Sequence, residues 1–189
     1  MLLLAPLCLI NVSVAVFGRT VVFPLSPFFL REKVAALGAY FWHRPRCLFT
    51  GHEPLGPLVA HAELRHHLPC GLLGAIVQVE SDGRVHMISS AGAMGPAQLL
   101  PSTARALGVS DPFDPADNLD GAARYLHAQL STFHDTRLAA AAYNAGPGAV
   151  VGRAVPHNGQ TEIYVVRVMH ALAVERHDRC VVARSRRAE

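Results

Sequence analysis

Apolar residues recur at helical spacing through most of the chain after residue 57. In the segment 114–133, apolar side chains return every three or four positions, which is typical of one face of a helix. The same spacing predicts helices over residues 58–67, 71–80, 96–107, 114–133, 136–144 and 160–176. Proline in the first turn and glycine after the last turn mark several of their ends. We therefore predict an all-α body, in which only the loop 82–95 is long enough for a small hairpin.

The first thirty residues differ from this body. Residues 2–18 carry no charge, and Arg19 is the only charged residue before Arg31. These 17 residues lie at the short end of the length that crosses a bilayer. We predict a hydrophobic signal or membrane-anchor segment over residues 1–34. The missing basic start disfavours a signal peptide, and the positive charges that follow favour a body on the inside, so cleavage and orientation stay open.

Composition changes between the segments suggest the domain boundaries. Residues 44–57 contain three prolines and two glycines, which indicates a linker. We predict a linker over residues 35–56, a folded domain over 57–176 and an arginine-rich tail over 177–189. The positive charges from residue 176 onward account for the whole net charge of +3. The body before them is balanced, so no basic face for nucleic acid is expected.

Composition also excludes several classes of protein. With 51% hydrophobic and 16% charged residues, the chain is not intrinsically disordered. The four cysteines form no CxxC pair, and the 11 histidines include no HExxH motif. We predict no metal site and no cofactor. Pairing of Cys70 with Cys180 is left open, because both could equally be free thiols.

Glu80 is the best candidate for a catalytic group. On a helix over residues 71–80 it shares one face with Leu73, Ile76 and Val77. Loss of water around a carboxyl in such a place raises its pKa. A carboxyl that holds its proton near neutral pH can act as a general acid.

Four motifs surround this glutamate in the sequence. They are VES at 79–81, SSAGAMGPAQLLPSTA at 89–104, NLDGAARYL at 118–126 and AAYNAGPGAV at 141–150. Together they resemble the soluble lytic transglycosylase family, in the family's order, over about residues 70–166. Gln98 follows Glu80 by eighteen positions, as in the family pattern. The resemblance implies a lysozyme-like, all-α catalytic domain that cleaves the glycan strands of peptidoglycan.

The resemblance also assigns roles to individual residues. It implies that Glu80 is the single catalytic residue, acting first as acid and then as base. It implies substrate contacts by Ser89 in a loop near the cleaved bond, Gln98 on the groove wall, Tyr143 and Asn144 facing Glu80 across a cleft, and Tyr164 in the groove. Two departures from the family pattern are Leu100 in place of a methionine and Gln160 in place of a glutamate.

The number of carboxyls near Glu80 favours one reaction. Most glycosidases use two carboxyls, and Asp82 is the only other acid between Glu80 and Gln98. At the helix end we expect Asp82 to point away from the face of Glu80. A single acid suits a route in which the substrate's N-acetyl group assists and the muramic acid C6 hydroxyl attacks. The product is then a 1,6-anhydro sugar.

Three other functions stay open. A lysozyme-type hydrolase would need Asp82 or a distant acid to hold water. A catalytically inactive protein could bind the wall as a scaffold of an envelope-spanning assembly. A membrane protein whose helical body binds partners would rest on residues 2–30 alone. For the transglycosylase we expect export to the periplasm or cell envelope, with membrane association through residues 2–30.

Overall fold

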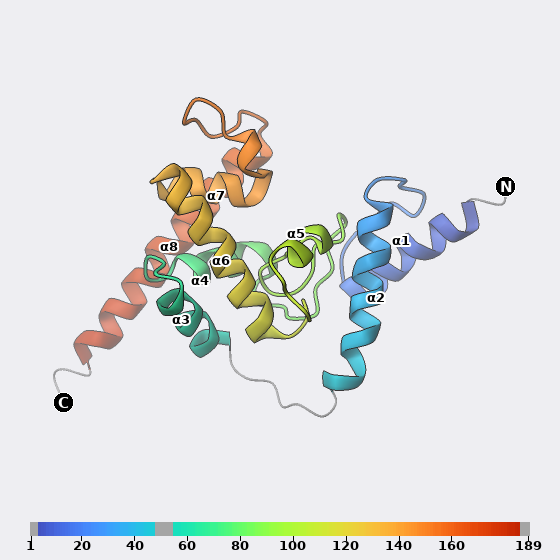
Figure 1. Cartoon of the computed structure of the whole chain (residues 1–189), viewed down its shortest axis with the longest axis horizontal. Coiled ribbons are helices and arrows are strands. Elements are labelled where there is room, and N and C mark those ends of the chain that lie inside the picture. The colour runs from blue at the N-terminus through green and yellow to red at the C-terminus, as the bar shows by residue number, and fades with distance from the viewer. Residues whose placement is uncertain (1–3, 48–54, 186–189) are drawn as a thin grey trace. The chain divides into compact units, whose positions relative to one another are not determined.

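The computed structural model describes residues 4–47 and 55–185, and the side chains of residues 4–43 and 55–176. Within these ranges the secondary structure is helical, with no named strand (Figure 1). The elements are α1 (Leu4–Gly18), α2 (Leu30–Cys47), α3 (Leu55–Arg65), α4 (Leu72–Ser81), α5 (Pro101–Ala106), α6 (Pro115–Phe133), α7 (Thr136–Ala145), the 3₁₀ turn η1 (Pro147–Ala149) and α8 (Gln160–Ser185). The predicted all-α class is confirmed.

The chain forms two compact units. The first unit combines the residues up to Leu58 with Glu80–Gly121, and the second combines Val59–Val79 with the residues from Ala122 onward. The boundaries fall inside α3, α4 and α6, so each of these helices contributes residues to both units.

The second unit is built from closely packed helices. In α7 the residues 138–143 are all buried, and four of them are alanines that let α7 and α8 approach each other. Asp135 caps α7, because its side chain accepts hydrogen bonds from the N–H groups of Arg137 and Leu138. Glu63, also buried, accepts bonds from the N–H groups of Gly71 and Leu73 at the start of α4. Helix starts in this unit are therefore fixed by acidic side chains.

The first unit contains α1, α2, α5 and the loop between α4 and α5. The predicted hairpin in this loop is reduced to isolated bridges, which join Ile88 to Met94 and Met94 to Leu99. Ile88, Met94 and Leu99 are buried and anchor the loop in the core of the unit.

The predicted helix 96–107 begins too early. Helix α5 starts at Pro101, and Leu100 before it is extended, with ψ of 147°. A residue that precedes proline is kept out of the helical region by the proline ring. Gln98 has a positive φ of 51°, which also interrupts a helix.

Residues 35–47 of the predicted linker are also helical, because they lie in α2. Buried positions of this helix include Lys33 and His43, and such polar groups hide the apolar period that marks a core-facing helix. Residues 48–54 of the predicted linker lie outside the described residues. The division of the chain into domains stays a prediction.

The last helix extends beyond residue 176, where its predicted end lies, as far as Ser185. The side chain of Cys180 and those of the predicted tail 177–189 lie outside the described residues, so the pairing of Cys70 stays open. Among the described helices, none has the length and apolar character needed to cross a membrane.

Candidate active site

Glu80 is the penultimate residue of α4 and is half-buried. The apolar residues one and two turns before it, Leu73, Ile76 and Val77, are buried as the helical pattern requires. The next residue, Ser81, is also buried, and its hydroxyl donates a hydrogen bond of 2.7 Å to the carbonyl oxygen of Pro96. This bond attaches the end of the helix that carries Glu80 to the loop that follows.

We call residues 87–99 the site loop, because it contains two of the predicted substrate-binding residues. One of them, Ser89, forms a tight turn in which its N–H donates to the carbonyl of Ala93. The Ser89 hydroxyl accepts bonds from the N–H groups of Ala91 and Ala93, at 3.2 and 3.0 Å. A hydroxyl that accepts these bonds keeps its own hydrogen to donate to another group.

Gln98, the second predicted residue of the site loop, is almost entirely buried. Its amide nitrogen donates to the carbonyl oxygens of Met87, at 3.2 Å, and Gly95, at 2.8 Å. The two amide hydrogens are therefore used inside the loop. The amide nitrogen of Gln98 therefore holds the loop closed. A position of Gln98 on the wall of the substrate groove stays a prediction.

Asn118, at the end of the first turn of α6, joins three parts of the first unit. Its side chain is fully buried, its oxygen accepts from the N–H of Ala97, and its nitrogen donates to the carbonyls of Met94 and Pro112. A side chain on Gly95 would lie 2.2 Å from the Pro112 oxygen and 2.5 Å from the Asn118 nitrogen. The loop therefore passes Asn118 so closely that only glycine fits at position 95.

The sequence motifs alone do not indicate this role of Asn118. Asn118 is the first residue of the motif NLDGAARYL, and this place in a family motif is the one feature of the sequence that could have drawn attention to it. The partners of its side chain lie up to 24 residues away in the sequence, so its hydrogen bonds cannot be inferred from spacing.

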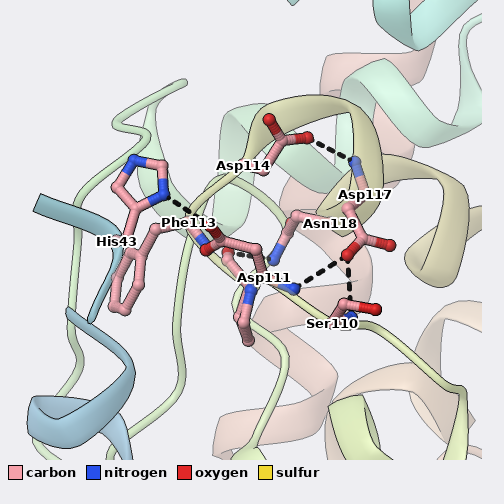
Figure 2. A network of polar contacts seen from close by, with 8 residues as sticks. His43, Ser110, Asp111, Phe113, Asp114, Asp117 and Asn118 are labelled. Atoms are coloured by element: carbon pink, nitrogen blue, oxygen red, sulfur yellow. Dashed lines mark hydrogen bonds and ion pairs between the residues drawn. The ribbon is translucent and has the colours of Figure 1, made fainter. Parts of the chain in front are cut away.

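The start of α6 is fixed by carboxylates (Figure 2). Asp114 accepts a bond of 2.9 Å from the N–H of Asp117 and so caps the helix. Asp117 in turn accepts from the N–H groups of Ser110 and Asp111, at 2.7 and 2.8 Å. These bonds fix the segment that leads into α6 and hence the position of Asn118.

The other predicted site residues belong to the second unit. Tyr143 on α7 is buried, and its ring centre lies 5.3 Å from that of Tyr125 on α6. Burial raises the pKa of Tyr125. Asn144 accepts a bond of 3.2 Å from the hydroxyl of Thr161, which ties the end of α7 to the start of α8. Tyr164 is buried in the second turn of α8.

The start of α8 contains the departure at Gln160. This residue is the first of the helix and is exposed. Glu162, two residues later, accepts a bond of 3.0 Å from the N–H of Gly159 and one of 2.7 Å from the His157 ring. The His157 hydrogen bond is the main cause that lowers the pKa of Glu162, and the Gly159 bond adds to it. A carboxylate is thus present in the first turn, although not at position 160.

Within the described part of the chain, no three or more histidine, cysteine, aspartate or glutamate side chains gather in a way that could hold a metal ion.

A family model described as the transglycosylase SLT domain matches residues 57–165. The match spans 109 of the 189 residues. The chain belongs to this family. All six predicted site residues lie within the matched range.

Curated relatives of this SLT-domain chain have related names. A transglycosylase of Enterobacteria phage PRD1 is 38% identical over 88 residues, which cover 47% of this chain and 33% of the relative. The membrane-bound lytic murein transglycosylase F 2 of Alkalilimnicola ehrlichii is 37% identical over 94 residues, which cover 46% of this chain and 21% of the relative. The membrane-bound lytic murein transglycosylase C of Haemophilus influenzae is 31% identical over 139 residues, which cover 64% of this chain and 39% of the relative. The SLT-domain chain thus spans less than half the length of these relatives.

A solved structure shares the fold. It is the lytic transglycosylase Slt of Pseudomonas aeruginosa, in an inactive form in which a glutamate is replaced by glutamine. The TM-score is 0.58 at 24% sequence identity, and the alignment covers 80% of this chain and 31% of the other. The lysozyme-like, all-α fold expected for the SLT family is confirmed.

In this SLT-domain chain, the first unit carries Glu80, Ser89 and Gln98 on one hydrogen-bonded scaffold. The second unit carries Tyr143, Asn144 and Tyr164. The substrate contacts of these residues stay predictions.

Proposed function

We propose that this chain is a peptidoglycan lytic transglycosylase. It cleaves the β-1,4 bond between N-acetylmuramic acid and N-acetylglucosamine and leaves a 1,6-anhydro-muramic acid end. The observation that carries the proposal is the half-buried Glu80, attached through Ser81 to a loop that is itself closed by hydrogen bonds, in a chain of the SLT family. The names of the relatives, which include lytic murein transglycosylases, support the same substrate.

Glu80 performs both proton transfers in the proposed reaction. As the glycosidic bond breaks, its carboxyl gives a proton to the bridging oxygen, and the positive charge that develops on the anomeric carbon is stabilised by the N-acetyl oxygen of the substrate. The C6 hydroxyl oxygen then attacks that carbon, and its proton passes to the Glu80 carboxylate. The acid is regenerated, no water is consumed, and no metal takes part in either step.

Two other residues support this assignment. Ser89 has a hydroxyl hydrogen to donate, which suits an acceptor such as an N-acetyl oxygen. Asp82, the alternative second acid, is exposed in a left-handed conformation just after α4. An exposed carboxylate is poorly suited to hold a water molecule against a sugar ring, which favours the route with a single acid.

The decisive experiment is mass spectrometry of the products released from purified peptidoglycan, with Glu80→Gln as the test variant and Asp82→Asn as its matched control. We expect anhydro-muramic ends from the wild type and the control, and a rate at least about a hundredfold lower for Glu80→Gln, since general acid–base catalysis contributes on this scale. The inactive glutamate-to-glutamine form of the Pseudomonas aeruginosa enzyme offers a parallel.

Other products would contradict the proposal. Reducing ends that have gained water, lost on Asp82→Asn, would identify a hydrolase. Binding of peptidoglycan by a folded wild type without any cleavage would identify an inactive scaffold. An envelope-spanning assembly as partner stays a prediction.

We also propose that the protein works in the cell envelope and that residues 4–30 associate with a membrane surface. Large apolar side chains are exposed along the connection between α1 and α2, most of all Val21 at 94% and Phe23 and Phe28 at 71% each. Both charged residues among the first 31, Arg19 and Arg31, are exposed cations. Apolar side chains beside arginines suit a surface of anionic lipids.

Flotation with vesicles tests the membrane proposal. We expect the full chain to float with vesicles of mixed anionic and zwitterionic lipid and to float less with purely zwitterionic ones. Phe23→Ser with Phe28→Ser should abolish flotation, whereas Val151→Ser, at an exposed position of the second unit, should not. Equal flotation of both variants would contradict the proposal.

A further inference from the structure

The N-terminal helices pack against the site loop. A side chain on Gly18, the last residue of α1, would lie 2.4 Å from the carbonyl oxygen of Ile88. A side chain on Gly92 would lie 2.7 Å from the carbonyl carbon of Glu32 and 2.8 Å from the nitrogen of Lys33 in α2. These two backbone contacts lie on either side of Ser89 in the sequence. The helices therefore directly support the turn that carries the Ser89 hydroxyl.

A buried polar pair joins the two helices to each other. The amine of Lys33 donates a bond of 2.7 Å to the side-chain oxygen of Asn11, and both side chains are inaccessible to solvent. The Asn11 nitrogen donates to the carbonyls of Leu7, Pro24 and Ser26. Buried polar groups with so many partners specify one arrangement, because any displacement leaves several of them unpaired. The connection between the helices is fixed by the same residue.

A second polar contact joins α2 to the segment that leads into α6. The His43 ring in α2 lies 2.9 Å from a carboxylate oxygen of Asp111, and both groups are buried (Figure 2). The other oxygen of Asp111 accepts a bond from the N–H of Phe113. The Phe113 ring packs against Tyr40 of α2, with ring centres 5.5 Å apart. From here the chain runs into α6 and Asn118, which holds the site loop at residues 94–97.

We propose that the N-terminal helix pair, residues 4–43, positions the site loop for glycan binding. The inference rests on the proposed function, because it takes the loop to be a substrate-binding element. Residues 4–43 have no substrate contact in this proposal, and they act through Ser89 and Gln98. A segment with the composition of a leader or anchor thereby becomes part of the active-site scaffold.

Two glycines provide a matched test in the full-length chain. Gly92 and Gly108 both have positive φ, of 85° and 69°, so alanine strains the backbone at both positions. A side chain at Gly92 meets α2, whereas at Gly108 it meets nothing within 4 Å. We expect Gly92→Ala to raise KM for peptidoglycan and lower kcat/KM by about tenfold to a hundredfold, as small displacements of binding groups do. Gly108→Ala should stay within about twofold of the wild type, because it leaves the loop in place.

Hydrogen–deuterium exchange supplies a readout that does not depend on activity. Peptides covering residues 86–99 should exchange faster in Gly92→Ala than in Gly108→Ala, while peptides of the second unit exchange equally. Equal exchange and equal KM in the two variants would overturn the proposal. If the wild type cleaves nothing, the proposed function fails, and the exchange comparison still decides whether the helices hold the loop.

A second pair of variants keeps the test valid if Gly92→Ala does not fold. His43→Ala removes the partner of Asp111, whereas His43→Asn keeps a nitrogen donor near the position of the ring nitrogen. We expect a raised KM and faster exchange of residues 86–99 in His43→Ala, and recovery of both in His43→Asn. A His43→Ala protein with wild-type KM and exchange would overturn the proposal.

Discussion

The two units of this molecule achieve their order by different means. In the second unit, α7 buries a run of alanines and its position follows from apolar packing. In the first unit, the site loop contains little regular structure and is held by single side chains such as Asn118 and Gln98. Apolar packing tolerates small losses at many positions, whereas a hydrogen-bonded loop depends on a few residues. The binding part of the first unit should therefore be the more sensitive to substitution.

The largest difference between the units is expected at two glycines that both have a positive φ. Gly95 in the first unit and Gly146 in the second have φ of 74° and 82°, but only at Gly95 does a side chain collide with other residues. We expect Gly95→Ala to lower the free energy of unfolding by about 3–4 kcal/mol, through strain and displacement of Asn118. For Gly146→Ala we expect a smaller loss of about 1–2 kcal/mol, from backbone strain alone. Urea unfolding measures both, and equal losses would remove the contrast.

Two asparagines sharpen the comparison at a smaller scale. Asn118→Ala leaves one N–H and two carbonyls of the buried loop without their partner, and we expect a loss of about 2–3 kcal/mol. Asn144→Ala removes one described hydrogen bond at a half-buried position, and we expect it to lower the free energy of unfolding by about 0.5–1 kcal/mol. Thermal unfolding of both variants is the measurement. A loss at Asn144 as large as that at Asn118 would contradict the idea that the first unit depends more on single polar residues.

The smallest effect should appear as a pH dependence at the start of α8. The folded-state pKa of Glu162 lies below its usual value of 4.5, because the His157 ring and the Gly159 N–H bind the carboxylate. A carboxyl with a lowered pKa stabilises the protein above pH 4.5, and this contribution disappears as the pH falls through the folded-state pKa. We expect the Tm difference between wild type and Glu162→Gln to shrink as the pH falls from 4.5 through the folded-state pKa. A difference that does not change with pH would exclude this role.

Apolar periodicity was enough to predict most of the second unit. The predicted helix 136–144 agrees with Thr136–Ala145, because a run of alanines and the glycine that follows the helix mark its position. Helix α2 could not be recognised in the same way, since its buried face includes Lys33 and His43. The sequence contains no indication that these polar residues have partners 22 and 68 residues away.

The candidate site divides in a similar way. The family resemblance selected Glu80 and the residues of the site loop from their motifs alone. It did not indicate that the amide nitrogen of Gln98 is occupied by two carbonyls, or that Asn118 joins three segments. Those contacts depend on the folded path of the loop, including the positive φ at Gln98, and spacing does not encode that path.

The contact between Gly18 and Ile88 has a practical consequence for producing the protein. Expression schemes often remove a hydrophobic N-terminus to improve solubility. Here a gene trimmed to begin at residue 35 would uncover Ile88, which is fully buried, and would take away Lys33 and the start of α2. The shortened product should aggregate or lose its ordered loop, so truncation is a poor remedy for low solubility.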